Sequence, residues 1–375
     1  MFETYLLYAI SACLLAGQFV RIELFNRMVN GYGQEFFILL FILYSLLKYG
    51  LEPIKKLSSK KSIKTVGLLF LISFFWTISR YTFAQNLVAV LFPLRLVLYI
   101  CFGVYLLNFV SKTKSRAIVD SIVYTFSILL LVGTAIQYFF FTNLWSLYTS
   151  GWDPHEFRTY FTFLDVYVAA ALFGMLCFYW IKKRNWILSF LFLLSLILSF
   201  SRSAYVAFVV VAVFSYLLRK KWKTLFFLIA LFVALVVLVP KPFGEGVNLL
   251  RTVSINSRIQ DYKVALLLWE KQPILGHGYN RIHFVKEKMG LIKMDDASHA
   301  ASSFHSSFLI VLTTGGLLGL GAFLYLLFDL MRKYKESVSI ISFVLIMSLF
   351  DNVILHVLVL LPLIILMVDQ KEAKA

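Results

Sequence analysis

Residues 298–328 read SHAASSFHSSFLIVLTTGGLLGLGAFLYLLF, a polar entry followed by a long apolar run. A helix formed by such a run can cross a hydrocarbon core of about 30 Å. Similar runs recur along the whole chain of 375 residues, of which 61% are hydrophobic and only 15% are charged. No soluble fold of this length buries so much apolar surface, and continuous rather than alternating runs argue against a barrel. The sequence therefore predicts an all-α integral membrane protein.

The apolar runs predict about twelve transmembrane helices. Their expected positions are 4–20, 35–50, 65–79, 88–110, 118–141, 162–181, 186–200, 203–218, 224–240, 303–330, 338–350 and 352–368. The first has an acidic flank and no basic region before it, so we interpret it as a retained helix. The chain then divides into N-terminal helices (1–185), helices around a polar junction (186–240), one large loop (241–302) and C-terminal helices (303–375).

Short basic clusters lie between these runs. They are KKLSSKK, KTKSR, KKR, RKKWK and RKYK, and the predicted topology puts all of them on one side. The positive-inside rule makes that side the cytoplasm, with both termini there, in a multi-pass protein of the inner (plasma) membrane. This explains the net charge of +17 without a nucleic-acid partner. The large loop 241–302 is then exofacial, and NSRIQDYKVALLLWEKQ within it predicts an amphipathic helix ended by PILGHGYN.

Arginine and lysine divide unequally between the two predicted sides. The cytoplasmic side holds four arginines and 17 lysines, whereas the exofacial side and the outer halves of the helices hold nine arginines and six lysines. Topology needs only positive charge, for which lysine suffices. The planar guanidinium instead binds phosphate oxygens in pairs, so an arginine excess on the outer face indicates a phosphorylated ligand. The outer arginines are Arg21, Arg27, Arg80, Arg95, Arg158, Arg202, Arg251, Arg258 and Arg281.

Four of these arginines are candidates for anion binding. Arg202 interrupts two apolar runs in SFSRSA, where it either snorkels to the interface or clamps an anion beside a helix N-terminus. Arg95 lies within a predicted span and either faces a wet cavity or pairs with Asp165 or Asp351. Arg258 and Arg281 flank the loop helix, on what is either a solvated face or an anion site; we expect Arg258 to begin that helix. A GHG sequence in the loop lacks the third glycine and the strand setting of a nucleotide-binding motif.

His305 is the candidate proton-transfer group. It precedes the apolar run, followed by Ser306, and is either a helix-start residue or a general base, since a neutral imidazole accepts a proton near pH 7. Glycines further along the run, Gly315, Gly316, Gly319 and Gly321, predict close approach by a neighbouring helix that would fix the histidine. His299 and Asp261 are supporting candidates. No histidine spacing typical of a metal site occurs, and the three cysteines lie in apolar runs, so we expect neither a metal nor a disulfide.

Three motifs occur in the same order as in a known family. SFSRSA, then SRIQDYKVALLLWEKQPILGHGYN, then FHSSFLIVLTTGGLLGLGAFL resemble the O-antigen ligase/polymerase superfamily over residues 190–330. The resemblance implies transfer of a glycan from undecaprenyl pyrophosphate to an acceptor hydroxyl by a metal-independent, inverting membrane glycosyltransferase without a cofactor. It implies pyrophosphate binding by Arg202 and Arg258 and acceptor activation by His305. The usual HN after the loop is HS here, so the role of Ser306 is open.

Other readings stay open. Within the family, a ligase that uses a glycolipid acceptor, as in lipopolysaccharide biosynthesis, and a repeat-unit polymerase are not separated by these motifs. A polytopic transporter predicts paired halves with matching broken helices, which the sequence lacks. A scaffold without chemistry leaves the arginine bias unexplained. Convergence of Arg202, Arg258 and His305 on one outward-facing cavity would favour the enzyme.

Overall fold

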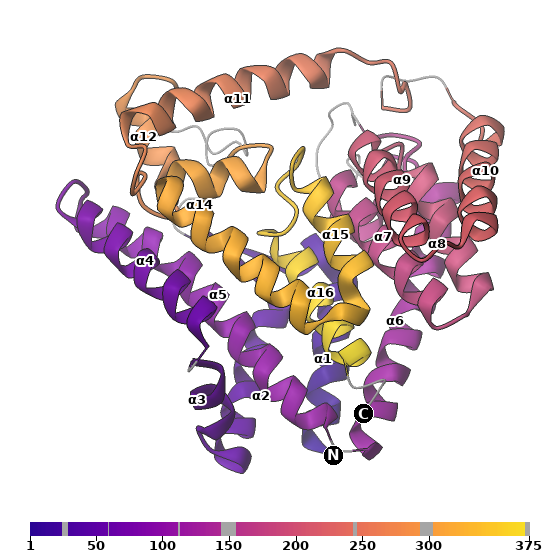
Figure 1. Cartoon of the computed structure of the whole chain (residues 1–375), viewed down its shortest axis with the longest axis horizontal. Coiled ribbons are helices and arrows are strands. Elements are labelled where there is room, and N and C mark those ends of the chain that lie inside the picture. Colours follow the sequence, from indigo (N-terminus) through magenta and orange to yellow (C-terminus); the bar gives the residue numbers. More distant parts are fainter. Residues whose placement is uncertain are drawn as a thin grey trace. The chain divides into compact units, whose positions relative to one another are not determined.

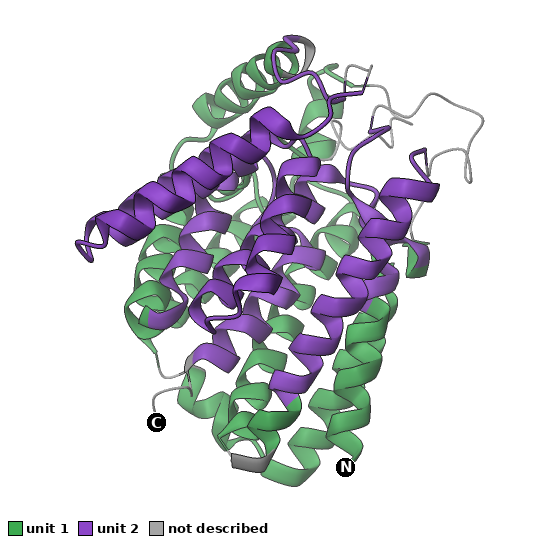
Figure 2. Ribbon diagram, turned by 90° about the vertical axis from the view of Figure 1, so that its right-hand side faces the viewer, with its two compact units in different colours: residues 1–13, 20–118, 255–335 green, residues 14–19, 119–254, 336–375 purple. Residues whose placement is uncertain are grey.

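The computed structural model describes residues 1–24, 29–58, 60–111, 113–143, 155–242, 246–292 and 303–371. The chain forms two compact units, each built from separated segments (Figure 2). Unit 1 comprises residues 1–13, 20–118 and 255–335, and unit 2 comprises residues 14–19, 119–254 and 336–375. Figure 1 gives the element labels used below.

Unit 1 is helical apart from one small hairpin. Its elements are α1 (Phe2–Ala16, of which the last residues belong to unit 2), β1 (Arg21–Leu24), β2 (Val29–Tyr32), α2 (Gly33–Tyr49), α3 (Glu52–Ser58), α4 (Lys61–Ile78), α5 (Phe83–Val110), α11 (Val253–Lys271), α12 (Ile282–Lys288) and α14 (Ser307–Lys333). Strands β1 and β2 pair antiparallel, with Arg21 opposite Tyr32. Helix α14 packs along α4, where Ser62 donates to Asp329 at 2.8 Å, and α2 packs on α5.

Unit 2 is a helical bundle around α7. Its elements are η1 (Gly17–Val20, mostly in this unit), α6 (Thr113–Phe140, from residue 119), η3 (Phe161–Phe163), α7 (Val166–Lys182), α8 (Trp186–Leu198), α9 (Arg202–Leu217), α10 (Trp222–Leu238), η4 (Lys335–Ser337, from residue 336), α15 (Val338–Met347) and α16 (Val357–Lys371). Helix α7 is buried on nearly all sides, as expected of a helix that is apolar all round. Gly174 makes room for α15, because a Cβ there would lie 2.0 Å from Cζ of Phe343.

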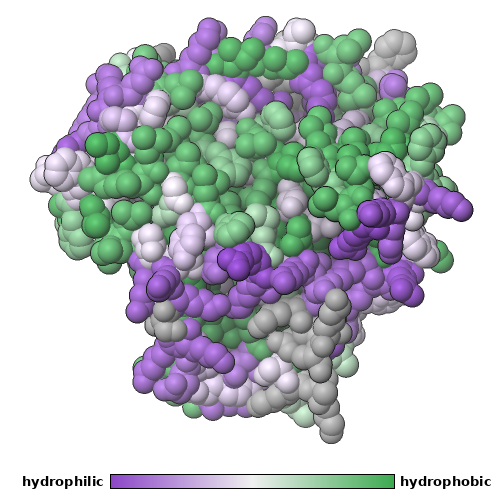
Figure 3. Space-filling model, viewed as in Figure 1, coloured by the Kyte–Doolittle hydropathy of each residue, from purple (hydrophilic) through white to green (hydrophobic). Residues whose placement is uncertain are grey.

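The helices fit the membrane prediction, and the number of spans stays a prediction. Each of the twelve expected segments contains an apolar helix. Five helices among the described residues are long and apolar enough to cross a membrane, namely those within 2–20, 61–78, 83–110, 115–140 and 307–333, and the other apolar helices are shorter. The face in Figure 3 carries a broad hydrophobic area bordered by hydrophilic residues, and lipid-facing helices require such a hydrophobic area. The protein is therefore an all-α integral membrane protein. Helix α12 is one of the short helices expected in the large loop, whereas the hairpin and α3 were not predicted.

Candidate active site

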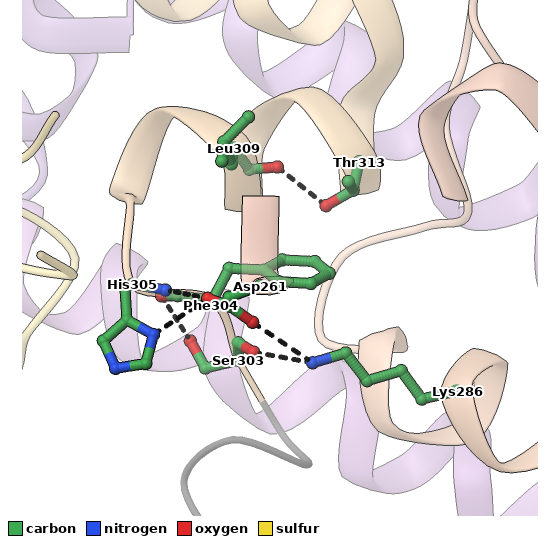
Figure 4. A network of polar contacts seen from close by, with 7 residues as sticks. All are labelled: Asp261, Lys286, Ser303, Phe304, His305, Leu309 and Thr313. Atoms are coloured by element: carbon green, nitrogen blue, oxygen red, sulfur yellow. Dashed lines mark hydrogen bonds and ion pairs between the residues drawn. The ribbon is translucent and has the colours of Figure 1, made fainter. Parts of the chain in front are cut away.

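Asp261 and His305 form the polar centre of unit 1 (Figure 4). Asp261 projects from α11, and His305 lies two residues before α14 begins. The Oδ2 atom of Asp261 accepts two hydrogen bonds from His305, one from its backbone N–H at 2.6 Å and one from Nδ1 at 2.9 Å. Two bonds from one residue fix both the backbone and the ring. Asp261, a supporting candidate from the sequence, thus contacts His305 directly.

This contact determines which nitrogen of His305 is available for chemistry. A carboxylate oxygen only accepts hydrogen bonds, so Nδ1 carries the proton in the bond to Asp261. In the neutral ring, Nε2 then holds the lone pair and can accept a proton. The side chain of Asp261 is 10% exposed and that of His305 is 40% exposed. The orienting group is therefore covered while the imidazole is open to a substrate.

Lys286 supports the same carboxylate from α12. Its Nζ lies 3.9 Å from Oδ1 of Asp261, donates to the carbonyl oxygen of Ser303 at 2.9 Å, and stands 4.1 Å from the centre of the Phe304 ring. The lysine is almost fully buried. It brings a positive charge to Asp261 and also holds the segment that leads into His305. This role could not be predicted from the sequence, because a lysine in a charged loop resembles a solvated residue.

A break in α14 fixes the helix that follows His305. Gly316 has φ 63° and ψ −164°, which interrupts the helix, and the segment PILGHG after α11 fills the interruption. The backbone N–H groups of His277 and Gly278 donate to Thr313 and Thr314 at 2.9 Å, while Leu317 N–H donates to the Pro273 carbonyl at 2.8 Å. Irregular backbone within an apolar helix requires such partners. Helix α11 and its C-terminal segment thus hold α14 at both its start and its break.

The glycine prediction is correct in one respect and wrong in another. A Cβ on Gly316 would lie 2.2 Å from the carbonyl oxygen of Ile274, so a close approach does occur there, but to a loop segment rather than to a helix. A Cβ on Gly315 or Gly321 would meet nothing within 4 Å, and one on Gly319 would meet only a backbone oxygen of α14 itself. These three glycines therefore do not serve close helix packing within the described residues.

Ser306 caps the helix. Its hydroxyl accepts from the backbone N–H of Leu309 at 3.4 Å, and the residue is buried. Serine is among the preferred residues at this position because it satisfies a free helix N–H. The departure from the usual HN is thus compatible with a well-formed start to α14.

Arg258 lies one turn before Asp261 on the same helix and is half-buried. Residues three apart share a helix face. The prediction that Arg258 begins the helix is wrong, because α11 starts at Val253. Backbone N–H groups of the helix start therefore cannot assist Arg258, and any anion it binds is held by the guanidinium itself.

Arg202 is the first residue of α9, in unit 2, as predicted. Its Nη1 donates to the carbonyl oxygens of Arg251 at 2.8 Å and Leu249 at 3.3 Å. Arg251 in turn donates from Nη1 to the carbonyl oxygens of Gly246 at 2.5 Å and Asn248 at 3.2 Å. The two arginines thus order the loop after α10 against the start of α9. Next to them, the hydroxyl of Ser203 donates to Asp351 at 2.6 Å.

Arg158 completes the positive cluster of unit 2. It is buried at the end of α8, where Nε donates to Ser199 O at 2.7 Å and Nη2 to Phe200 O at 3.2 Å. A cation at a helix C-terminus complements the helix dipole. Burial, the largest cause, and the nearby positive charges of Arg251 and Arg202 together lower the pKa of Arg158 to about 9, while Tyr205 and Asp351 act in the opposite direction. The potential here is therefore positive, and an anion would be attracted.

Arg95 and Arg281 have partners inside unit 1. Arg95 forms a largely buried ion pair with Glu35, with Nε 2.6 Å from Oε1, and also donates to the carbonyl of Asn30. The predicted partners Asp165 and Asp351 are thus wrong.

Arg281 is fully buried, stacks on the rings of Phe74 and Tyr81, and donates to Asn86 at 2.5 Å. Burial lowers the pKa of Arg281, while Tyr81 opposes the shift. These contacts indicate that Arg281 serves the packing of unit 1.

Two other histidines near this region differ from His305. His277 is buried and its Nε2 lies 2.7 Å from the carbonyl oxygen of Leu268, so this nitrogen donates the bond; burial lowers the pKa of His277. His299 lies outside the described residues. Among the residues that the structure describes, no group of three or more His, Cys, Asp and Glu side chains is arranged to hold a metal ion.

The fold and the paired polar residues define a polytopic membrane protein with an exposed, carboxylate-oriented histidine. Residues 187–324 match the sequence model of the family described as O-antigen ligase. This match confirms the resemblance to the O-antigen ligase/polymerase superfamily, whose members are glycosyltransferase-like enzymes. It extends from α8 into α14 and so includes Arg202, Asp261 and His305. A search of curated proteins finds no match to the chain.

Proposed function

We propose that the protein is an inverting glycosyltransferase that transfers a glycan from undecaprenyl pyrophosphate to a sugar hydroxyl. The observation that carries this proposal is the double hydrogen bond from His305 to Asp261, which leaves Nε2 as the proton acceptor on an exposed ring. A capping histidine needs no such orientation. A general base does, because proton transfer requires a lone pair aimed at the reacting hydroxyl.

In the proposed reaction, Nε2 of His305 takes the proton of the acceptor hydroxyl. The acceptor oxygen attacks the anomeric carbon from the face opposite the carrier, and the bond between that carbon and the pyrophosphate oxygen breaks. The electron pair of this bond leaves with undecaprenyl pyrophosphate. Asp261 stabilises the imidazolium formed at His305, as a carboxylate does when it holds a catalytic histidine. The imidazolium later releases its proton to water.

The leaving pyrophosphate gains negative charge, and arginines are suited to stabilise it. Preorganised cationic donors are among the strongest contributions to such a step. We assign this role to Arg258, which lies one turn before Asp261 on α11 in unit 1, and the family resemblance makes Arg202, described within unit 2 alone, a further candidate. Arg251 and Arg158 support Arg202 by ordering the loop and the helix junction around it. We leave Arg95 and Arg281 out, because Glu35 and two aromatic rings already engage them.

The acceptor distinguishes the two activities within the superfamily. A ligase would use a hydroxyl of a glycolipid core, and a polymerase would use a second carrier-linked repeat unit. Purified protein mixed with carrier-linked glycan and each acceptor in turn tests both. Transfer to either acceptor without an ion gradient or ATP supports the enzyme, whereas movement of the carrier across vesicles with no transfer would indicate a transporter instead.

The proposal also requires the predicted orientation. Gly246→Cys, in the large loop, should react with a membrane-impermeant thiol reagent in intact cells, and Lys221→Cys, in the turn before α10, should not. A background with Cys13, Cys101 and Cys177 replaced by serine controls for native thiols. Labelling of Lys221→Cys alone would invert the topology and remove the exofacial mechanism.

A further inference from the structure

A basic cavity lies in unit 2 where the turn between α7 and α8 meets the turn between α9 and α10. It has a volume of about 330 Å³, and its lining includes the cations Lys182, Arg184, Arg219 and Lys221. Glu336 is the one carboxylate among the lining residues, and it pairs with Lys182 at 2.6 Å. The cavity therefore carries a net positive charge that the protein itself leaves uncompensated.

Three of the cations are available to a ligand. Arg184, Arg219 and Lys221 are exposed, and no carboxylate of the described residues forms an ion pair with them. The hydroxyls of Ser215 and Ser339, 3.1 Å apart, add neutral hydrogen-bonding groups to the lining. The positive-inside rule accounts for basic turns at this end of the helices, but it needs no cavity. The hollow between the turns thus requires a separate explanation.

A second cavity continues from the first along α8 and α10. It has a volume of about 580 Å³ and shares Ile181, Trp186 and Thr224 with the basic cavity. Its other walls are largely apolar, including Phe190 and Phe227, which are exposed toward the surroundings of the helices. Trp186, also exposed, stands where the two meet, and tryptophan favours the headgroup level of a bilayer.

We propose that the two cavities together bind one anionic glycerophospholipid. The basic cavity takes the phosphate and its headgroup, and the apolar cavity takes an acyl chain. Both volumes fall in the range of small-molecule sites. A soluble phosphate would occupy only the basic cavity and leave the apolar one empty. A zwitterionic lipid carries a cation in its headgroup, which the three cations of the basic cavity would repel. Basic pockets between transmembrane helices bind anionic headgroups for the same reason.

This site is separate from the one proposed for glycan transfer. Helix α9 begins at Arg202 and ends at Leu217, next to the basic cavity. Its 16 residues span about 24 Å, so Arg202 and the basic cavity lie at opposite ends of the helix. The predicted topology assigns the lipid site to the cytoplasmic leaflet. The inference does not rest on the proposed function, and either can fail alone.

Native mass spectrometry of the full-length protein in detergent tests the proposal. The probes are dioleoylphosphatidylglycerol, dioleoylphosphatidylcholine, glycerol 3-phosphate and undecaprenyl phosphate. We expect the wild type to bind the phosphatidylglycerol most tightly. The variant R184Q/R219Q/K221Q should bind it about a hundredfold more weakly, at roughly fivefold for each cation. The larger side chain of Leu231→Trp fills the apolar cavity. This variant should bind phosphatidylglycerol more weakly and should bind glycerol 3-phosphate as the wild type does.

A charge-matched control separates a site from general attraction. Lys60, Lys61 and Lys64, at the start of α4 in unit 1, replaced together by glutamine, should change binding by less than twofold. Equal loss in this control, or no loss in R184Q/R219Q/K221Q, overturns the site. Glycerol 3-phosphate binding as tightly as the lipid would make it a phosphate site, and stronger binding of undecaprenyl phosphate would make it a carrier site; both contradict the proposal. Thermal unfolding confirms that each variant is folded.

Discussion

The polar residues of unit 1 and those of unit 2 differ in what they orient and in how exposed they are. Around His305, a single buried carboxylate orients a ring that stays 40% exposed. Around the junction of α8 and α9, Arg202 and Arg158 donate to backbone carbonyl oxygens, and Arg158 does so from Nε and Nη2 at the end of α8. The first arrangement orients the imidazole ring, so that Nε2 is the nitrogen left to accept a proton. The second brings several guanidinium groups together while their side chains stay largely covered. The proposed glycan transfer would use a proton acceptor and positive charge, and mutations in each unit test these properties separately.

His305→Ala should have the largest effect. Removing a general base costs about 10²–10⁴-fold in rate, whereas carrier binding should remain nearly unchanged because it depends on arginines. Transfer rate and carrier-lipid binding are measured on the same purified variant. Near wild-type turnover would reduce His305 to a helix-start residue, and Asp296 and His299 would be the next candidates for the base.

Arg202→Lys should lower transfer by roughly ten- to a hundredfold with the protein still folded. Lysine keeps the charge but cannot reproduce the planar guanidinium fork that binds two phosphate oxygens. Arg219→Lys, just beyond the other end of the same helix, is the matched control and should transfer normally. If both variants are fully active, Arg202 serves only to anchor the helix at the interface.

Asp261→Asn should lower kcat about tenfold with little change in KM. The amide oxygen can still accept both hydrogen bonds from His305, so the ring keeps its place, but no negative charge remains to stabilise the imidazolium. Steady-state kinetics with saturating acceptor resolve the two constants. A rise in KM at constant kcat would show that Asp261 shapes the acceptor site rather than acting through His305. Asp261→Ala, which removes the acceptor atom as well, should be more severe.

The sequence predicted the parts of this molecule that depend on local pattern. Continuous apolar runs located the helices to within a few residues, because a helix in lipid must be apolar along its length. His305 and Arg202 were found because a polar residue at the edge of such a run is conspicuous. The bond between Asp261 and His305 joins residues 44 apart in the chain, and no local period encodes it. The hairpin of β1 and β2 has no long apolar run, and the alternation in RIEL covers only the four residues of β1, which is too short to stand out.

The break in α14 shows the same limit. Glycines in an apolar helix suggested helix packing, and only the structure reveals that one of them turns the backbone to admit PILGHG. The GHG sequence and the glycine cluster are two sides of one contact. Neither motif could be interpreted alone, because each supplies the hydrogen-bond partners that the other lacks.

Gly316→Ala should lower the transfer rate least among these variants, because it changes no reacting group, but it should clearly lower the stability of the protein. Its φ of 63° is unfavourable for any residue with a Cβ, and the added atom would lie 2.2 Å from the Ile274 carbonyl oxygen. Strained backbone of this kind costs about 1–3 kcal/mol, and the segment after α11 must also shift. Because that segment and Asp261 belong to the same stretch of chain, the start of α14 should lose its alignment with Asp261, and transfer should fall severalfold.

The neighbouring Gly315→Ala is a close control, since its Cβ would meet nothing within 4 Å and alanine favours a helix over glycine by roughly 0.5–1 kcal/mol. Thermal unfolding in detergent and transfer are compared for the two variants. We expect a lower Tm and weaker transfer for Gly316→Ala only. Equal behaviour of the two would mean that the break in α14 does not hold His305. The orientation of His305 would then rest on its bonds to Asp261 and on the contact of Lys286 with Ser303, without help from the break.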